Sequence, residues 1–270
     1  HNVPGMLVRS VYTQRDGQPL LTWGSFTTTP SSPISERWGG WYVTGQHGDS
    51  QHMGNKWLTT GADGQERFRE QDGQNVETLS GYINTDAYLT NTSDLVALMI
   101  MEHQIEAHNV FAAARMNYLR RMYMIKAIHH GKFDAKEPTT AKMIQTHVSE
   151  ILKILLFVDE IRLTGDGVQG SDEFVTEFRK RGKSYNQWSL RDLRLQKRLF
   201  KYRCSFMINS ASFKMLPELI KTETLRQLHG ILVKDATPEG LPKLSGREKE
   251  RIHQILMHTH PDYQQANPER

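Results

Sequence analysis

The chain has 270 residues, of which 37% are hydrophobic and 24% are charged, and its formal net charge at pH 7 is +4. This length can enclose a hydrophobic core without disulfides. The single cysteine, Cys204, excludes an intrachain disulfide and a CxxCH haem-attachment motif within these residues. No apolar run approaches the roughly 20 residues of a membrane-spanning helix. Because the net charge also falls short of a nucleic-acid-binding profile, we expect a water-soluble domain that binds no nucleic acid.

The chain begins at His1, with neither an initiator methionine nor the basic and apolar segments of a signal peptide. We therefore expect a mature fragment or a piece of a longer protein. The missing leader carries no information about the compartment, and the sequence contains no signal for the oligomeric state.

The first 92 residues are rich in Gly, Thr, Ser and Trp and carry repeated turn signals such as Gly39-Gly40 and Asp63-Gly64. This pattern predicts loops and short strands. Because four exposed indoles would be very costly, we expect the segment to pack on the rest of the chain. The four tryptophans in it are Trp23, Trp38, Trp41 and Trp57.

From Ser93 onward, apolar residues recur at helical spacing, with Ser93, Ser189 and Ser245 as expected N-caps. Ser245 is followed three residues later by Glu248, the spacing of a capping box. The pattern predicts a mainly α fold, in which a helical bundle-like domain over 93–270 carries the irregular segment 1–92 packed on it. The expected helices span 94–130, 138–163, 171–180, 189–208, 216–233 and 245–258.

The densest cluster of chemically active residues is the glycine-rich loop 45–55, which contains His47, His52 and Met53 and follows the aromatic segment 37–42. Imidazole or thioether donors, a flexible backbone and flat apolar walls suit a haem iron. The alternative is a hydrogen-bonded surface turn over a tryptophan cluster. The pattern by itself leaves both interpretations open.

A second cluster lies on the two long predicted helices, where we consider Glu102, His103 and Glu160 as candidate metal ligands. Facing carboxylates and imidazoles in a helical bundle bind metals in di-iron proteins. Those bundles use Glu-x-x-His, whereas this chain has the reverse order, His103-x-x-Glu106. The alternative is a buried polar network in which the three residues tie the helices to the N-terminal segment.

Basic residues are concentrated between Glu177 and Arg203, where ten Lys or Arg residues accompany two acidic ones. This stretch could dock an anionic protein or a haem propionate. The alternative is a solvated loop followed by one charged helix face.

Several of these stretches together resemble a family of uncharacterised, exported bacterial proteins that is frequent in planctomycetes. Many members carry a c-type haem attachment motif shortly before the position where this chain begins. The resemblance therefore implies a periplasmic, cytochrome c-associated domain with haem c as cofactor and a periplasmic redox protein as partner. The attachment cysteines are absent from this chain, so its own residues imply no covalent haem. The stretches are 3–12, 35–45, His47-Gly48, 52–55, 93–99 with Glu102-His103-Gln104 and His108-Asn109, 155–160, and 189–200.

The first functional hypothesis is a haem-associated electron-transfer or redox-sensing domain. Met53 is its expected distal ligand, because a thioether raises the reduction potential, and His52 and His47 are the alternates. In this hypothesis Arg37 pairs with a haem propionate. The pocket walls are Trp38 and Trp41.

Two other hypotheses remain open. One is a periplasmic metal-dependent enzyme whose cleft lies between the aromatic segment and the helices, with Glu102, His103 and Glu160 as acid, base or metal ligands. The other is a non-catalytic scaffold module in which the conspicuous residues are purely structural.

Overall fold

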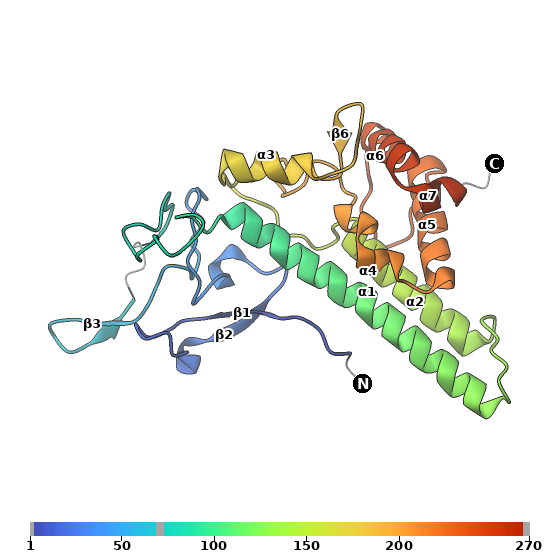
Figure 1. The fold of residues 1–270 in the computed structure, drawn as a ribbon, viewed down its shortest axis with the longest axis horizontal. Coiled ribbons are helices and arrows are strands. Elements are labelled where there is room, and N and C mark those ends of the chain that lie inside the picture. Colours follow the sequence, from blue (N-terminus) through green and yellow to red (C-terminus); the bar gives the residue numbers. More distant parts are fainter. Residues whose placement is uncertain (1–2, 69–72, 267–270) are drawn as a thin grey trace.

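The computed structural model describes residues 3–68 and 73–266, which form seven α-helices and three two-stranded antiparallel sheets (Figure 1). The fold is therefore mixed α/β, and the prediction of a mainly α fold is wrong. It fails because parts of both the N-terminal third and the segment after the third helix pair as hairpins. The sheets pair β1 (Val8–Val11) with β2 (Ser25–Thr28), β3 (Thr59–Thr60) with β4 (Glu66–Arg67), and β5 (Ser184–Tyr185) with β6 (Trp188–Ser189).

Two long helices, α1 and α2, run antiparallel, and α2 also packs against α5, which is covered by α6 and α7 (Figure 1). The helices are α1 (Leu95–Ile128), α2 (Pro138–Leu155), α3 (Asp172–Lys180), α4 (Ala211–Lys214), α5 (Glu218–Val233), α6 (Gly246–Thr259) and α7 (Pro261–Gln265). The described residues also form three short 3-10 helices, η1 (Leu21–Trp23), η2 (Ile34–Glu36) and η3 (Phe206–Asn209). Within the described ranges, no helix combines the length and the apolar character that crossing a membrane requires.

The predicted second helix ends earlier than expected, and the predicted helix 189–208 does not form. Helix α2 stops at Leu155 because the chain then adopts left-handed backbone at Phe157 (φ 54°) and Asp159 (φ 65°). Between 189 and 205 the chain forms turns, with Leu193 paired to Phe200 in an isolated β-bridge and Leu195 left-handed at φ 59°. Tertiary packing of its apolar residues outweighs their helical spacing here.

The N-terminal third and the helices share one hydrophobic core, which includes Trp38 and Val43 together with the first turns of α1. Residues 95–96 and 98–100 of α1 are all buried, since the N-terminal third surrounds this end of the helix (Figure 1). A helix that is apolar on all sides is stable only inside such an enclosure. The expected packing of the N-terminal segment on the rest of the chain is therefore present, although Trp23 on η1 is 47% exposed.

The N-cap of α1 is Asp94, not the predicted Ser93. Asp94 Oδ1 accepts a hydrogen bond from the Ala97 amide at 2.9 Å, and its other carboxylate oxygen accepts one from the amide of Ser171, the N-cap of α3. One carboxylate thus joins the starts of two helices.

We expect Asp94→Ala to lower the free energy of unfolding by about 1–2 kcal/mol, because it removes a helix cap and leaves the second amide without its acceptor. Ser93→Ala is the matched control and should change it by less than about 0.5 kcal/mol. Urea denaturation followed by circular dichroism measures both changes. Equal losses in the two variants would show that Asp94 does not have this role.

Candidate functional site

The three candidate haem ligands of the loop 45–55 are buried inside the N-terminal third. His47, His52 and Met53 are each 2% exposed. The Met53 thioether already accepts a hydrogen bond from Ser10 Oγ at 3.5 Å, and the Ser10 hydroxyl in turn accepts the amide of Gly39 at 2.7 Å. The sulfur atom therefore links the loop to strand β1.

The two histidines of this loop lie against each other, with ring centroids 4.7 Å apart. The pKa of His52 is lowered to about 3, chiefly by burial and further by repulsion from His47. Burial also lowers the pKa of His47, whose Nε2 accepts the Asn75 amide at 3.0 Å. Both rings are therefore neutral at pH 7, and Nε2 of His47 is occupied.

These residues do not fit a haem in the arrangement that they adopt. A methyl group built on Gly54 would lie 2.5 Å from Val43 Cγ2, and one built on Gly39 would lie 2.9 Å from Met53 Cε. A position that cannot accept one carbon atom cannot accept a macrocycle. Trp38 is 1% exposed, and the Trp41 indole N–H donates to the Arg9 carbonyl at 2.9 Å, so both rings are held by protein contacts.

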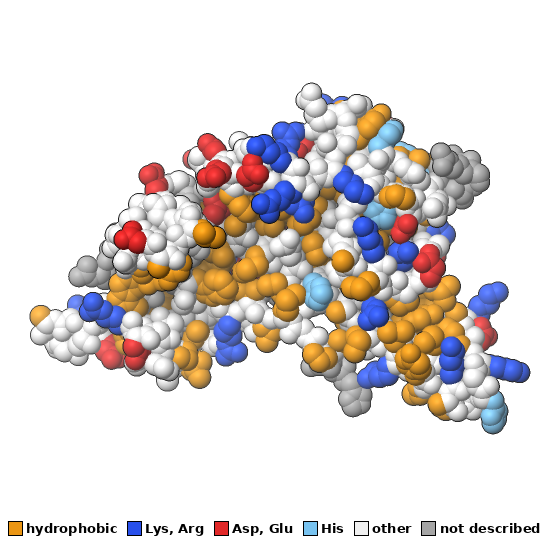
Figure 2. All heavy atoms as spheres, in the orientation of Figure 1, with side chains coloured by type: hydrophobic (Ala, Val, Ile, Leu, Met, Phe, Trp, Pro, Cys, Tyr) orange, Lys and Arg blue, Asp and Glu red, His pale blue; other side chains and the backbone are white. Residues whose placement is uncertain are grey.

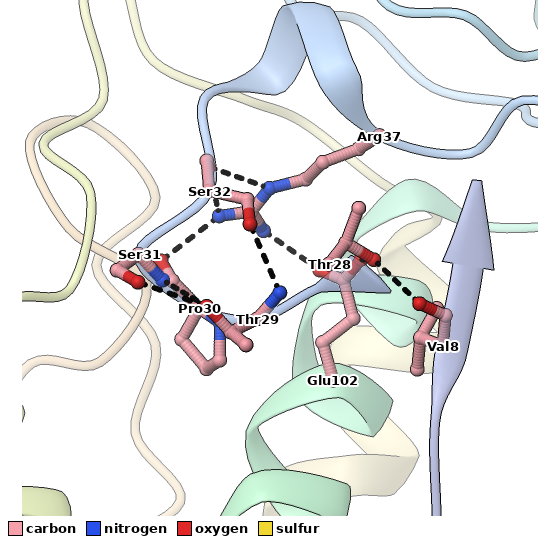
Figure 3. A network of polar contacts seen from close by, with 8 residues as sticks. All are labelled: Val8, Thr28, Thr29, Pro30, Ser31, Ser32, Arg37 and Glu102. Carbon is pink, nitrogen blue, oxygen red and sulfur yellow. Dashed lines mark hydrogen bonds and ion pairs between the residues drawn. The ribbon is translucent and has the colours of Figure 1, made fainter. Parts of the chain in front are cut away.

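Arg37, the predicted propionate ligand, is instead paired with Glu102 of α1 (Figure 3). Its Nη1 donates to Glu102 Oε2 at 2.7 Å, while Nε and Nη2 donate to the carbonyls of Pro30 and Ser32. The Thr28 hydroxyl lies 3.2 Å from the other Glu102 oxygen and 3.5 Å from the Val8 carbonyl. Arg37 and Glu102 are both 1% exposed. Glu102 therefore belongs to a buried polar network that ties α1 to the N-terminal segment, which was the alternative to a metal site.

His103 is sealed in an aromatic cage next to Glu102. Its ring centroid lies 4.7 Å from that of Phe157 and 5.8 Å from that of Phe200, and burial lowers its pKa to about 3. Its Nε2 lies 2.6 Å from Ser205 Oγ, a distance typical of a nucleophile and its base. Because His103 is 2% exposed and Ser205 is 0% exposed, no substrate reaches this pair.

The three candidate metal ligands face different surroundings: Glu102 binds Arg37, His103 binds Ser205, and Glu160 lines a cleft. No group of three or more His, Cys, Asp or Glu side chains suited to a metal ion occurs within residues 3–68 and 73–266. The residues therefore do not fit a metal site built from these three side chains.

Glu160 is the one candidate that meets solvent in a large cavity. It lies in a cleft of about 970 Å³ between the turn that follows α2, the segment 194–203 and the loop before α6. Burial raises the pKa of its carboxyl to about 7, although Arg198, Arg37 and the Leu199 amide oppose this shift. The side chain is thus surrounded by protein and still open to the cleft.

The walls of this cleft carry more cationic than anionic side chains. The Glu248 carboxylate holds two of the guanidinium groups, Arg198 at 3.1 Å and Arg203 at 2.8 Å. Arg194 and Lys197 are exposed and form no ion pair with the described residues. The complete charged lining is Arg162, Arg194, Lys197, Arg198 and Arg203 against Asp159, Glu160 and Glu248.

The sequence signal for this cleft was the basic stretch 177–203, whose members at 194, 197, 198 and 203 line it. Glu248 was identified only as the second residue of a capping box. Its amide does donate to Ser245 Oγ at 3.3 Å, but its carboxylate binds Arg198 and Arg203 across the cleft. The bridging role of Glu248 depends on α6 lying beside the segment 194–203, which no local pattern indicates.

Comparison of the chain with models of protein families, with curated proteins and with solved structures finds no match. The geometry of the cleft therefore has to support any assignment without a relative.

Proposed function

We propose that the protein is an enzyme that binds a small anionic molecule in the cleft between α2 and α6, and that Glu160 transfers a proton to or from it. The observation that carries the proposal is a carboxyl group with a pKa of about 7 on the wall of a mainly cationic cleft. A perturbed acid in a large cleft is a common mark of an active site.

The two kinds of residue have separate roles. Arg194 and Lys197 attract and hold the anionic group, because they lie on the cleft wall and have no carboxylate partner among the residues that the structure describes. Glu160 is half protonated near pH 7, which is the condition for efficient general acid–base catalysis. The left-handed backbone at Phe157 and Asp159, on either side of Val158 and just before Glu160, is of the strained kind that clusters at active sites. The supported reaction class is a proton-transfer step on a substrate that carries a carboxylate or phosphate.

The haem-associated function and the periplasmic location stay predictions from the resemblance. Because His47, His52 and Met53 are sealed by protein contacts, we derive no step that involves a haem. The second candidate is a binding module without chemistry. The arginine pair held by Glu248 suits anion binding whether or not a reaction follows. Whether Glu160 takes up a proton when a ligand binds separates the two candidates.

Calorimetric titration at pH 7 in two buffers of different ionisation enthalpy tests the proposal, with succinate and glycerol phosphate as probes. An anion bound beside Glu160 raises its pKa further, so the wild-type protein should take up part of a proton on binding. Subtracting the value for Glu160→Gln removes any proton that the probe itself gains. No proton uptake assigned to Glu160 would rule out its catalytic role.

A pair of charge variants tests the binding half of the proposal in the same titrations. Arg194→Gln/Lys197→Gln should weaken binding about tenfold or more, since each lost charge-assisted contact is worth about 1.5 kcal/mol or more. Lys126→Gln/Lys132→Gln changes the net charge equally, far from the cleft, and should leave binding unchanged. Equal weakening in both double variants would mean that only the overall charge matters.

The stability of the protein should also depend on the Glu160 proton. The pKa of Glu160 is about 7 in the folded state and 4.5 in its ordinary state, so the folded protein binds more protons between these values. Its contribution to the free energy of unfolding is therefore present below about pH 4.5 and is lost as the pH rises to about 7. The difference in unfolding free energy between wild type and Glu160→Gln, measured from pH 4 to 8, should show this slope. A flat difference would contradict the raised pKa.

A further inference from the structure

A second cavity, of about 400 Å³, lies between the end of α3, the hairpin β5–β6 and the segment 206–210. Three cationic side chains line it, Arg181, Lys183 and Arg191, and its lining contains no Asp or Glu. Figure 2 shows Lys and Arg side chains at one end of α3 and just below it, beside Asp and Glu side chains over the same helix. The cleft of Glu160 differs in this respect, because three carboxylates share its walls.

Arg191 is held in place by aromatic rings and not by an acid. Its guanidinium carbon lies 4.7 Å from the ring centroid of Phe178 and 4.8 Å from that of Phe206. One of its N–H groups donates to the Phe178 carbonyl at 3.3 Å. A guanidinium clamped between two rings keeps its position and leaves its other donors free for a ligand.

The backbone fixes the other cations relative to Arg191. The Ser189 hydroxyl donates to the Lys183 carbonyl at 2.9 Å and accepts the Arg191 amide at 3.2 Å. Gly182 lies so close that a methyl group built on it would be 2.7 Å from Ser189 Oγ and 3.0 Å from Arg191 Cδ. The Lys183 ammonium donates to the Thr259 carbonyl at 2.9 Å, which anchors it at the end of α6.

Uncommitted neutral donors complete the lining. Gln104 and Asn209 line this cavity, and their side-chain amides form no hydrogen bond with the part of the chain that the structure describes. Within the same described part, Arg181, Lys183 and Arg191 have no ion-pair partner. Three cationic residues and two residues with uncommitted amides thus line one cavity whose lining holds no carboxylate.

We propose that this cavity binds the phosphoryl group of a small phosphorylated molecule, at a site separate from the cleft of Glu160. A phosphate monoester carries about −1.5 to −2 charges at pH 7 and three acceptor oxygens, so it matches several cations better than a single carboxylate does. The planar guanidinium of Arg191 can donate two parallel hydrogen bonds to such a group, and the amides of Gln104 and Asn209 can satisfy the remaining oxygens.

The test is calorimetric titration of the intact chain with inorganic phosphate, pyrophosphate and citrate at constant ionic strength. Arg181→Gln/Lys183→Gln should weaken phosphate and pyrophosphate binding about tenfold or more, and Arg191→Lys should weaken it while retaining the charge. Lys180→Gln is the control for Arg181, because Lys180 is next to it in sequence, does not line the cavity and pairs with Glu177. Circular dichroism verifies that each variant folds.

Phosphate binding that is equally strong in wild type and Arg181→Gln/Lys183→Gln would overturn the proposal, as would an equal loss in Lys180→Gln. Tighter binding of citrate than of pyrophosphate would contradict the phosphoryl assignment. Binding that is lost in Arg194→Gln/Lys197→Gln but retained in Arg181→Gln/Lys183→Gln belongs to the cleft of Glu160, and it would likewise overturn this second site while leaving the first intact.

Discussion

Replacing Arg37 by methionine should lower the free energy of unfolding by about 3–5 kcal/mol, because it leaves the Glu102 carboxylate buried without its cation. Burial already raises the pKa of Glu102, and Arg37 is the largest of the influences that oppose this shift, with Thr28 and Trp38 after it. The variant should therefore regain part of its stability as the pH falls and Glu102 becomes protonated. Urea denaturation at pH 7 and at pH 5 measures both effects.

The control for this prediction is the double variant Arg37→Met/Glu102→Met, in which neither charge remains. Replacing a buried ion pair by apolar residues of similar volume is often close to neutral. We expect the double variant to be clearly more stable than Arg37→Met. If the two variants were equally unstable, the loss would come from the carbonyls of Pro30 and Ser32 that Arg37 also binds, not from the unpaired carboxylate.

Replacing Gly167 by alanine should lower the free energy of unfolding by about 3 kcal/mol or more. The added methyl group overlaps the backbone nearby, and alanine is disfavoured in the left-handed conformation of this residue. The added methyl group would overlap the Leu195 carbonyl oxygen and lie 2.5 Å from Gln196 Cα, and the backbone at Gly167 has φ +84°. The segment 194–198 would have to move, and it carries Arg194 and Lys197 of the cleft. We therefore expect weaker binding of succinate together with the loss of stability.

Gly165→Ala is the matched control, because Gly165 is also left-handed, at φ +56°, but has no atom within 4 Å of a built methyl group. Gly165→Ala should lower the free energy of unfolding by only about 1–2 kcal/mol, the cost of placing alanine in a left-handed conformation. Thermal and urea denaturation compare the two variants directly. An equal cost in both would mean that the chain around Leu195 yields without strain.

After the end of α3, the basic stretch 177–203 continues in turns and short strands and not in a helix. Its cations at 181, 183 and 191 line the cavity beside α3, and those at 194, 197, 198 and 203 line the cleft beside α6. In a regular helix over 189–208, Arg191 and Arg198 would both project from that one helix at fixed angles around its axis. The observed turns allow Arg191 to stack between Phe178 and Phe206 while Arg198 reaches Glu248 on another element.

Local patterns were sufficient for the helices whose caps and apolar spacing agree. The sequence by itself determined α1, α3, α5 and α6 to within a few residues, including the Ser245 cap, and it indicated Glu160 as a chemically active residue. These features depend on hydrogen bonds and side-chain spacing within one or two turns of chain, which a sequence displays directly.

Only the tertiary structure decided which polar residues are reachable. It buried His47, His52 and Met53, committed Arg37 to Glu102 across 65 positions, and left Glu160 open to a cleft completed by Glu248. Burial and long-range pairing depend on which distant segments meet, and a carboxylate has the same local pattern whether it is sealed or solvated. The physical reason is that desolvation, which sets the pKa of Glu160 and the cost of separating Arg37 from Glu102, is a property of the assembled surroundings.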